Sequence, residues 1–286
     1  MGFLGKQAGP FRVIGEGSTL FPAVNVFAGV EDVRTHDPVE RRDYVDFLDS
    51  QCGYPPADYF KKPLNLNAPA LDFLNVRFLL SMNPRFHDSM RPSDVSAEKW
   101  RPVYSGPDGE VLENRHVLPR VFAPRTVVGV GPPGSARDRV RSATPLFAAA
   151  YAELRRQSDW SQKAFVLGAP LEEHGNGEAE IHDYAEAVGR VTFGVRARGG
   201  SAGTVLLVSL VQDGGWSGRD ETGRVLPTSL ANGPFLAVSV PDGAHDVVLD
   251  YAPPGARAGL AVSLGTLLAV AVSGMAARAS RAATGV

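Results

Sequence analysis

The stretch AVGRVTFGVRARGGSAGTVLLVSLV (residues 187–211) contains two runs rich in valine, leucine and phenylalanine, separated by a segment rich in glycine. Short runs of β-branched and aromatic residues bounded by glycine turns are typical of β-strands. We therefore expect one strand over 187–198 and a second over 204–211. This pattern favours a β-rich fold.

The same pattern continues on both sides of this stretch. Further runs of strand character lie at KAFVLG (163–168), EAEIHDY (178–184), GPFLAVSVP (233–241) and AHDVVLDYAP (244–253). The turn signals GG, DGG, NG and DG separate several of these runs. Several short strands at close spacing predict an antiparallel β-sandwich, which we place over 158–256.

Residues 1–157 have a mixed α+β pattern. A strand is expected over 11–14, and LDFLNVRFLLS (71–81) reads as a helical turn that leads into a buried strand. RPVYS, the turn PDGE and VLEN predict a hairpin.

Two helices are expected in this part. One lies near 38–48, with Pro38 at the first helical position and Asp37 as its cap. The other, over 144–157, is the clearest helix of the chain. Its predicted apolar face consists of Leu146, Ala149, Ala150 and Leu154.

The run AGLAVSLGTLLAVAVSGMAA (258–277) contains no charged residue. A bilayer core about 30 Å thick needs roughly 20 apolar helical residues, so we expect a transmembrane helix over 257–278 and a short basic tail over 279–286. The alternative is a buried helix of a soluble protein. Small residues in the run indicate packing against other membrane helices. Arg278 and Arg281 indicate a cytoplasmic C-terminus, with residues 1–256 on the other side of the membrane.

Composition excludes several classes of protein. The chain has 286 residues, of which 44% are hydrophobic and 21% charged, as in ordinary globular domains. The net charge of −2 and the scattered basic residues give no surface for nucleic acid. A single cysteine, Cys52, allows no internal disulfide. The first 17 residues contain no continuous apolar segment, so we expect no signal peptide in them.

Four blocks of sequence resemble the C-terminal part of the YfhO family of bacterial multispanning membrane proteins. They cover nearly the whole chain in the family's order, and the last, with its Gly-Trp turn, Asn-Gly turn and Tyr-x-Pro-Pro segment, is the most specific. The blocks are LFPAVNVFAGVEDVRTHDPVERRDYVDFL (20–48), LDFLNVRFLLS (71–81), VLENRHVLPRVF (111–122) with 144–168, and 215–265.

The resemblance implies a function at the bacterial cell envelope. The family resembles membrane glycosyltransferases that take sugars from polyprenyl phosphate and decorate envelope glycopolymers. On this basis residues 1–256 would be an extracytoplasmic domain of a longer protein, facing the substrate and close to membrane lipid and other transmembrane helices. The acidic catalytic residue of such enzymes belongs to an early loop outside this chain, so we expect no catalytic residue here. The opposing hypothesis is a membrane-anchored carbohydrate-binding or scaffold module without transferase activity.

Candidate substrate-facing residues gather in NVFAGVEDVRTHDPVERRDY (25–44), whose polar side chains suit a sugar or a phosphate. Trp216, in the turn DGGWSGRD, offers a flat face on which a sugar ring can stack. For the loop the alternative is a structural network of caps and ion pairs, and for Trp216 it is a plug at the end of a sheet. The candidates are Asn25, Asp32, Arg34, His36, Asp37, Arg41 and Trp216.

Three other motifs point to chemistry less specifically. GVGPPG (129–134) matches a dinucleotide-binding fingerprint, but Pro132 and Pro133 have no N–H group to donate to a phosphate. A Pro-Gly loop therefore fits this segment better. A soluble dinucleotide-binding enzyme is the weakest hypothesis for the chain. The cluster EEHGNGEAEIHDY (172–184) has no metal-ligand spacing. Cys52 in a Pro-rich loop is a poor nucleophile candidate. We therefore expect neither a metal nor a cofactor.

Overall fold

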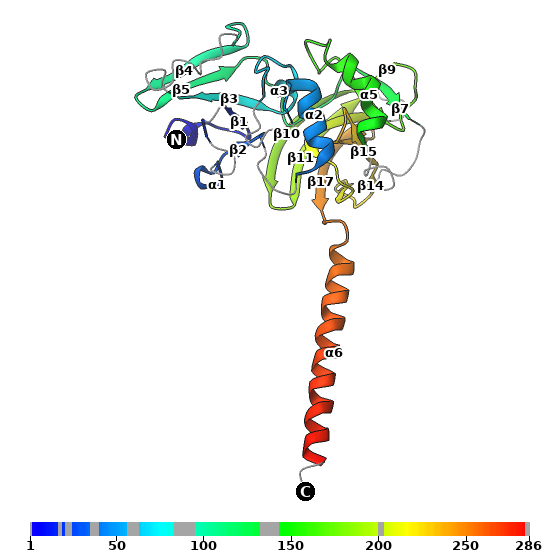
Figure 1. Cartoon of the computed structure of the whole chain (residues 1–286). Helices are drawn as coiled ribbons and strands as arrows, with labels where there is room; N and C mark the ends of the chain where they lie inside the picture. The colour runs from blue at the N-terminus through cyan, green and yellow to red at the C-terminus, as the bar shows by residue number, and fades with distance from the viewer. Residues whose placement is uncertain are drawn as a thin grey trace.

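The structure is a computed structural model, and it describes residues 2–16, 19–20, 25–34, 40–55, 63–82, 95–131, 143–199 and 203–283. It is β-rich, with three sheets, a small number of helices and a long C-terminal helix, as the sequence predicts. Figure 1 shows the sheets and shorter helices together at one end of the molecule and the C-terminal helix projecting away from them.

Two sheets form the predicted sandwich. Every pairing in the smaller sheet is antiparallel. Its strands are, in spatial order, β10 (Glu178–Ala187), β11 (Arg190–Arg198), β17 (Gly243–Tyr251), β13 (Trp216–Arg219) and β14 (Val225–Leu226). The larger sheet has the order β6 (Val121–Phe122), β12 (Thr204–Val211), β16 (Phe235–Val240), β15 (Thr228–Ala231), β8 (Lys163–Leu167), β7 (Thr126–Val130) and β9 (His174–Gly175).

The apolar core between these two sheets follows from alternation along the strands. Leu206 and Val208 of β12 lie in this core, whereas Leu207 between them belongs to the core on the opposite face of the same sheet. In the smaller sheet, Val191 and Phe193 of β11 lie in the same core as Leu206. Successive side chains of a strand point to opposite faces, so one strand supplies both cores.

Helices and loops cover the other face of the larger sheet. The helices are α2 (Arg42–Cys52), α3 (Ala70–Phe73) and α5 (Ala143–Leu154). Phe235 of β16 packs edge to face on Phe47 of α2, with ring centroids 4.7 Å apart, and on Phe73 of α3 at 4.8 Å. Trp160 joins the same aromatic cluster and is 1% exposed. This cluster joins segments that precede residue 157 to segments that follow it.

Both predicted helices form, but with different details. The first begins at Arg42 and has Arg41 as its cap, so Pro38 is not its first residue. The first buried residue of this helix is Val45, so the apolar face that packs on the core begins later in the chain than a helix starting at Pro38 would place it.

The second helix, α5, buries most of its predicted face, including Ala150 and Leu154, and Leu146 packs partly buried against the core. Phe147, Ala150, Tyr151 and Leu154 are buried, whereas Ala149 is exposed. Burying the aromatic pair Phe147 and Tyr151 removes more apolar surface from water than burying the alanines.

The segment from β7 to β8 departs from the expected antiparallel pattern. β7 and β8 pair in parallel, with α5 between them in the chain. Parallel neighbours need a crossover connection, and a helix commonly supplies it. The expected boundary between 157 and 158 thus falls inside a β–α–β unit, whose strands both belong to the larger sheet.

A third, mixed sheet lies beside the sandwich. Its order is β2 (Glu31–Asp32), β1 (Arg12–Gly15), β3 (Val76–Ser81), β5 (Gly109–Asn114) and β4 (Trp100–Gly106). β4 and β5 form the predicted hairpin. The short helices η1 (Leu4–Lys6) and α1 (Asn25–Ala28) lie near this sheet.

The C-terminal helix α6 (Ala256–Ala283) makes no core with the rest of the described chain. Its apolar window Ala258–Met275 has a mean hydropathy of 1.9 and is 0% buried. Leu260, Leu264 and Leu268 are each more than half exposed. At about 1.5 Å per residue, the 28 residues of the whole helix α6 are longer than the thickness of a bilayer core. Within the described residues, the alternative of a helix buried in a soluble fold is therefore wrong.

Candidate functional site

Asp32 and Arg34, two of the predicted substrate-facing residues, form a buried ion pair. Their side chains are 1% and 0% exposed, and Arg34 Nη2 lies 2.7 Å from Asp32 Oδ2. Arg34 Nε also donates to both carboxylate oxygens, at 3.2 and 3.1 Å. Nη2 donates further to the carbonyl oxygens of Thr19, at 2.9 Å, and Leu20. These bonds tie β2 to the segment at 19–20.

Asn25 and Arg41 make local contacts as well. Asn25 donates from Nδ2 to the carbonyl oxygen of Val30 at 2.9 Å and closes the turn after α1. Arg41 pairs with Asp43 at 2.9 Å in the first turn of α2. His36 and Asp37 lie outside the described residues. Asn25, Asp32 and Arg34 thus make the contacts expected of the structural alternative. Arg41 differs, because its buried Nε has no hydrogen-bond partner among the described residues.

Trp216 lies half-buried at the start of β13. Its indole N–H donates to the carbonyl oxygen of Val211 at 3.2 Å, and its ring lies 5.1 Å from that of Tyr251 in a tilted arrangement. The indole also packs against the sandwich core. These contacts favour a plug at the end of the sheet over an open stacking platform.

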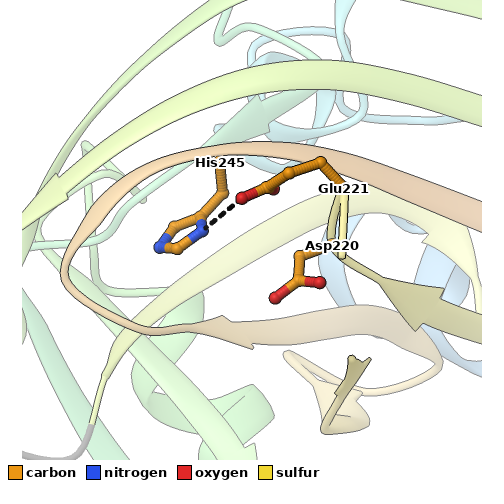
Figure 2. A group of neighbouring side chains, drawn as sticks. All are labelled: Asp220, Glu221 and His245. Atoms are coloured by element: carbon orange, nitrogen blue, oxygen red, sulfur yellow. Dashed lines mark ion pairs between the residues drawn. The ribbon is translucent and has the colours of Figure 1, made fainter. Parts of the chain in front are cut away.

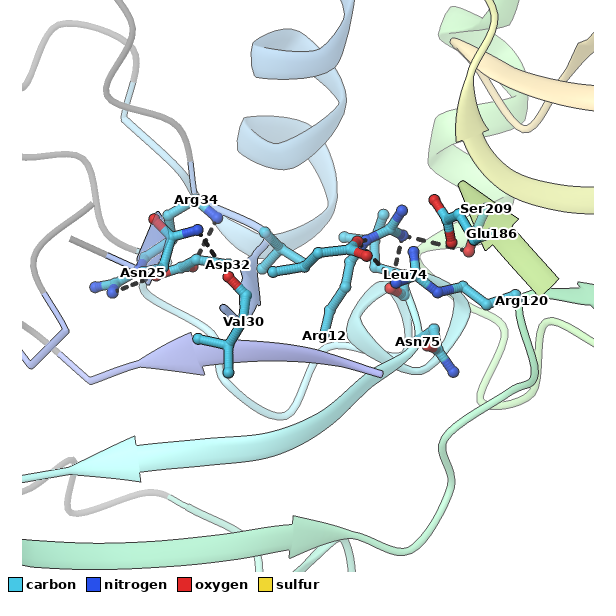
Figure 3. Close-up of polar contacts among 12 residues, drawn as sticks. Arg12, Asn25, Val30, Asp32, Arg34, Leu74, Asn75, Arg120, Glu186 and Ser209 are labelled. Atoms are coloured by element: carbon cyan, nitrogen blue, oxygen red, sulfur yellow. Dashed lines mark hydrogen bonds and ion pairs between the residues drawn. The ribbon is translucent and has the colours of Figure 1, made fainter. Parts of the chain in front are cut away.

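A second group of charged residues lies where the third sheet meets the sandwich. Arg12 of β1 donates from Nε to Glu31 Oε2 at 3.0 Å, and Arg120 Nη2 lies 2.7 Å from the same oxygen. Arg12 Nη1 also donates to the carbonyl oxygen of Leu74 at 3.0 Å and to Ser209 Oγ at 3.3 Å. Figure 3 shows this group beside the Asp32–Arg34 pair. Two arginines here share one carboxylate.

The charges of this group shift its pKa values. Burial by itself would raise the pKa of Glu31, but Arg12 and Arg120 outweigh it and hold that pKa below its usual value. Burial and then repulsion by Arg120 lower the pKa of Arg12. Arg12 and Arg120 therefore lie close enough to repel each other while both attract the carboxylate of Glu31.

Arg120 is the residue whose donors are least satisfied in this group. Its side chain is 2% exposed, and its Nε and Nη1 atoms have no hydrogen-bond partner within the described parts of the chain. Leaving a buried donor unpaired costs about 1–3 kcal/mol. Such atoms mark a place where water or a ligand completes the structure.

A cavity of about 460 Å³ opens beside Arg120. The edge strand β10 contributes Ile181, His182, Asp183 and Tyr184 to its wall, and β6 contributes Phe122. Asn75, between α3 and β3, lies in the wall too, and its Oδ1 has no hydrogen-bond partner among the described residues. The wall of the Arg120 cavity therefore contains two residues with unpaired buried polar atoms, apolar and aromatic side chains, and the ion pair His182–Asp183.

The other sequence motifs lie elsewhere. Gly129 donates its N–H to the carbonyl oxygen of Pro170 at 2.6 Å, and a Cβ on it would lie 2.0 Å from the carbonyl oxygen of Ala169. Backbone therefore covers the first glycine of GVGPPG, and 132–134 lie outside the described residues. Burial raises the pKa of Cys52 to about 12, which keeps the thiol protonated and unreactive. In the stretch 172–184, Glu173 is paired with Lys163 at 2.7 Å.

Sequence reasoning missed the Arg120 cavity because its walls come from distant parts of the chain. The polar residues near β2 were the only sequence signal close to the Arg120 cavity, and they indicated the neighbouring Asp32–Arg34 pair instead. Comparison with known proteins identifies no relative: no family model, no curated protein and no solved structure matches the chain.

Proposed function

We propose that this chain is the envelope-facing, glycan-binding region of a multispanning membrane glycosyltransferase, without catalytic activity of its own. The observation that carries the proposal is the Arg120 cavity, which is lined by a residue with unpaired buried donors and belongs to a domain followed by an exposed apolar helix. Among the polymers of an envelope, a glycan bearing phosphate or carboxylate groups matches this combination best.

The chemistry of the cavity suits a sugar with an anionic group. Sugar hydroxyls both donate and accept hydrogen bonds. Asn75 Oδ1 can accept from such a hydroxyl, and the Arg120 guanidinium can donate to one. Arginine binds phosphate or carboxylate through charge-assisted bonds. Tyr184 and Phe122 offer aromatic surface to the apolar face of a sugar ring. A volume of about 460 Å³ lies in the range of small-ligand pockets.

The position of α6 supports a site at a membrane surface. β17 ends at Tyr251, and α6 begins at Ala256, so a short linker joins the sandwich to the apolar helix. Gly259 and Gly265 leave space on its surface, since a Cβ on either would meet nothing within 4 Å. Small residues allow close approach of another transmembrane helix. Arg278 and Arg281 favour a cytoplasmic end for this helix, with the sandwich outside the cell.

The transferase part of the proposal rests on the resemblance of the four sequence blocks. The donor would be a polyprenyl-phosphate sugar and the acceptor an envelope glycopolymer. In such a reaction a general base activates the acceptor hydroxyl for attack on the anomeric carbon. We assign that base to another part of the protein, and to the Arg120 cavity the holding of the anionic polymer.

Binding by the full chain in detergent tests the glycan site. The probes are poly(glycerol phosphate) oligomers, uronate-containing oligosaccharides and neutral oligosaccharides of equal length. We expect the anionic probes to bind, and Arg120→Met to weaken that binding at least tenfold. The matched control is Arg101→Met, because Arg101 pairs with Glu113 on the exposed hairpin. Equal affinity for neutral probes, or unchanged binding in Arg120→Met, would contradict the proposal.

A membrane-anchored carbohydrate-binding module without transferase activity is the second candidate. The described residues contain one helix long and apolar enough to span a membrane, which suffices for an anchor. The size of the native product separates the two. A C-terminally tagged band in the membrane fraction far above 30.4 kDa supports the multispanning protein, and a band near 30.4 kDa supports the anchored module. A soluble band would contradict both.

A further inference from the structure

Three ligand-type side chains meet at the end of the smaller sheet of the sandwich. Asp220 and Glu221 lie in the turn between β13 and β14, and His245 lies near the start of β17. One atom from each side chain lies within 4.8 Å of one from each of the others. Figure 2 shows the imidazole ring of His245 facing the carboxylate of Glu221, with the side chain of Asp220 beside them. The pattern is invisible in the sequence because the turn and the strand are far apart in it.

Each of the three side chains is held through one of its polar atoms. Asp220 Oδ1 accepts from the N–H groups of Thr222 and Arg224, both at 3.0 Å. Glu221 Oε2 accepts from the N–H of Asp246 at 3.0 Å. His245 Nε2 lies 3.4 Å from the carbonyl oxygen of Asp242.

Second contacts of this kind orient metal ligands in proteins. The opposite ring nitrogen of a ligating histidine commonly donates to a carbonyl oxygen, as Nε2 of His245 can here. Gly243, with φ of +124°, leaves room beside this ring, because a Cβ there would lie only 3.3 Å from Nε2. The contact with the carbonyl oxygen of Asp242 therefore favours a ring orientation in which Nδ1 faces Glu221.

The remaining atoms of His245 and Glu221 face each other without forming a hydrogen bond. His245 Nδ1 is buried and has no hydrogen-bond partner in the described part of the chain, although its side chain is 15% exposed. It lies 3.5 Å from Glu221 Oε1, which is longer than a normal hydrogen bond. A tetrahedron with metal–ligand distances of about 2.1 Å has edges of about 3.4 Å, so this spacing suits a shared cation.

We propose that Asp220, Glu221 and His245 bind one divalent cation of the zinc type, with a fourth position open to water. One imidazole and two carboxylates suit zinc, whereas calcium takes six to eight oxygen ligands. The side chain of Glu221 is 43% exposed, so the site is accessible from solvent. The cation joins the β13–β14 turn to β17, the strand that leads into α6, and its binding is independent of the proposed glycan function.

The test is titration of the full, metal-stripped chain in detergent with Zn²⁺. Calorimetry measures the stoichiometry and Kd, and thermal unfolding measures the change in Tm. We expect one equivalent to bind and to raise the Tm by about 5 °C at a hundredfold excess over Kd. Glu221→Gln and His245→Gln should each weaken binding at least tenfold. The matched control is His182→Gln, which removes an exposed histidine paired with Asp183 at 2.8 Å and should bind as the native chain does.

Two results would overturn the proposal. One is the absence of stoichiometric Zn²⁺ binding to the native chain. The other is a wrong response of the variants: Zn²⁺ binding with native affinity in His245→Gln, or loss of Zn²⁺ binding in His182→Gln. If the site variants do not fold, X-ray absorption of the zinc-loaded native chain decides: one imidazole nitrogen with oxygen ligands supports the site, and sulfur or several imidazoles contradict it. None of these results depends on glycan binding.

Discussion

Glu31 and Asp32 are neighbours in β2, yet the arginine groups around them differ. Asp32 meets Arg34, whose Nε and Nη2 atoms bind the carboxylate and two carbonyl oxygens. Glu31 is shared between Arg12 and Arg120, and two nitrogens of Arg120 have no partner among the described residues. Consecutive side chains of a strand point to opposite sides, which separates the two groups. The comparison shows that satisfied hydrogen bonding, more than residue type, distinguishes a structural arginine from a candidate binding arginine.

The largest effect is expected at the satisfied pair. Arg34→Leu leaves the carboxylate of Asp32 buried without its partner, which should cost about 3–5 kcal/mol of unfolding free energy. Denaturant unfolding of the full chain in detergent measures this loss. Glycan affinity of the remaining folded protein should be unchanged. A variant that stays stable but loses glycan binding would show that Arg34 faces substrate after all.

Trp216 extends the comparison to an aromatic candidate whose polar atom is also satisfied. Trp216→Ala removes its packing on the core and its bond to Val211. Because the residue is half-buried, we expect a loss of about 2 kcal/mol, below the 3–5 kcal/mol of fully buried aromatics. Thermal unfolding measures this loss, and glycan titration serves as the control. Weaker glycan binding at unchanged stability would instead support a stacking role.

The shared carboxylate should show itself in the pH dependence of stability. The pKa of Glu31 is lowered in the folded state, so its contribution is present above the unfolded pKa near 4.5 and is lost as pH falls through the folded pKa. Its side chain is 50% exposed, so we expect Glu31→Gln to cost about 1 kcal/mol at pH 7. The difference between the two proteins should shrink below pH 4.5. A difference independent of pH would contradict this account.

The smallest effect on stability is expected at Arg120 itself. Arg120→Met removes one ion pair but also two buried unpaired nitrogens, so the unfolding free energy should change by less than about 1 kcal/mol in either direction. Thermal unfolding of this variant beside Arg34→Leu sharpens the contrast between the two arginines. A loss as large as that of Arg34→Leu would mean that Arg120 is structural and that the cavity has no binding role.

The sequence determined the elements whose signals are local. The strand over 204–211 and the strand over 163–167 lie where their apolar runs predict them. The turn signals at 232–233 and 242–243 do separate strands. The apolar run after 257 forms the long helix, because a charge-free segment of that length has a strong helical signal by itself.

The tertiary structure decided which elements meet. β11 and β12 follow each other in the sequence but belong to different sheets, and β8 pairs in parallel with β7 across α5. The Arg120 cavity and the Asp220–Glu221–His245 group both combine side chains from distant segments. A local pattern records which face of a strand or helix is apolar. The partner of that face depends on how all the faces are buried together, so the sites that form between partners exist only in the folded chain.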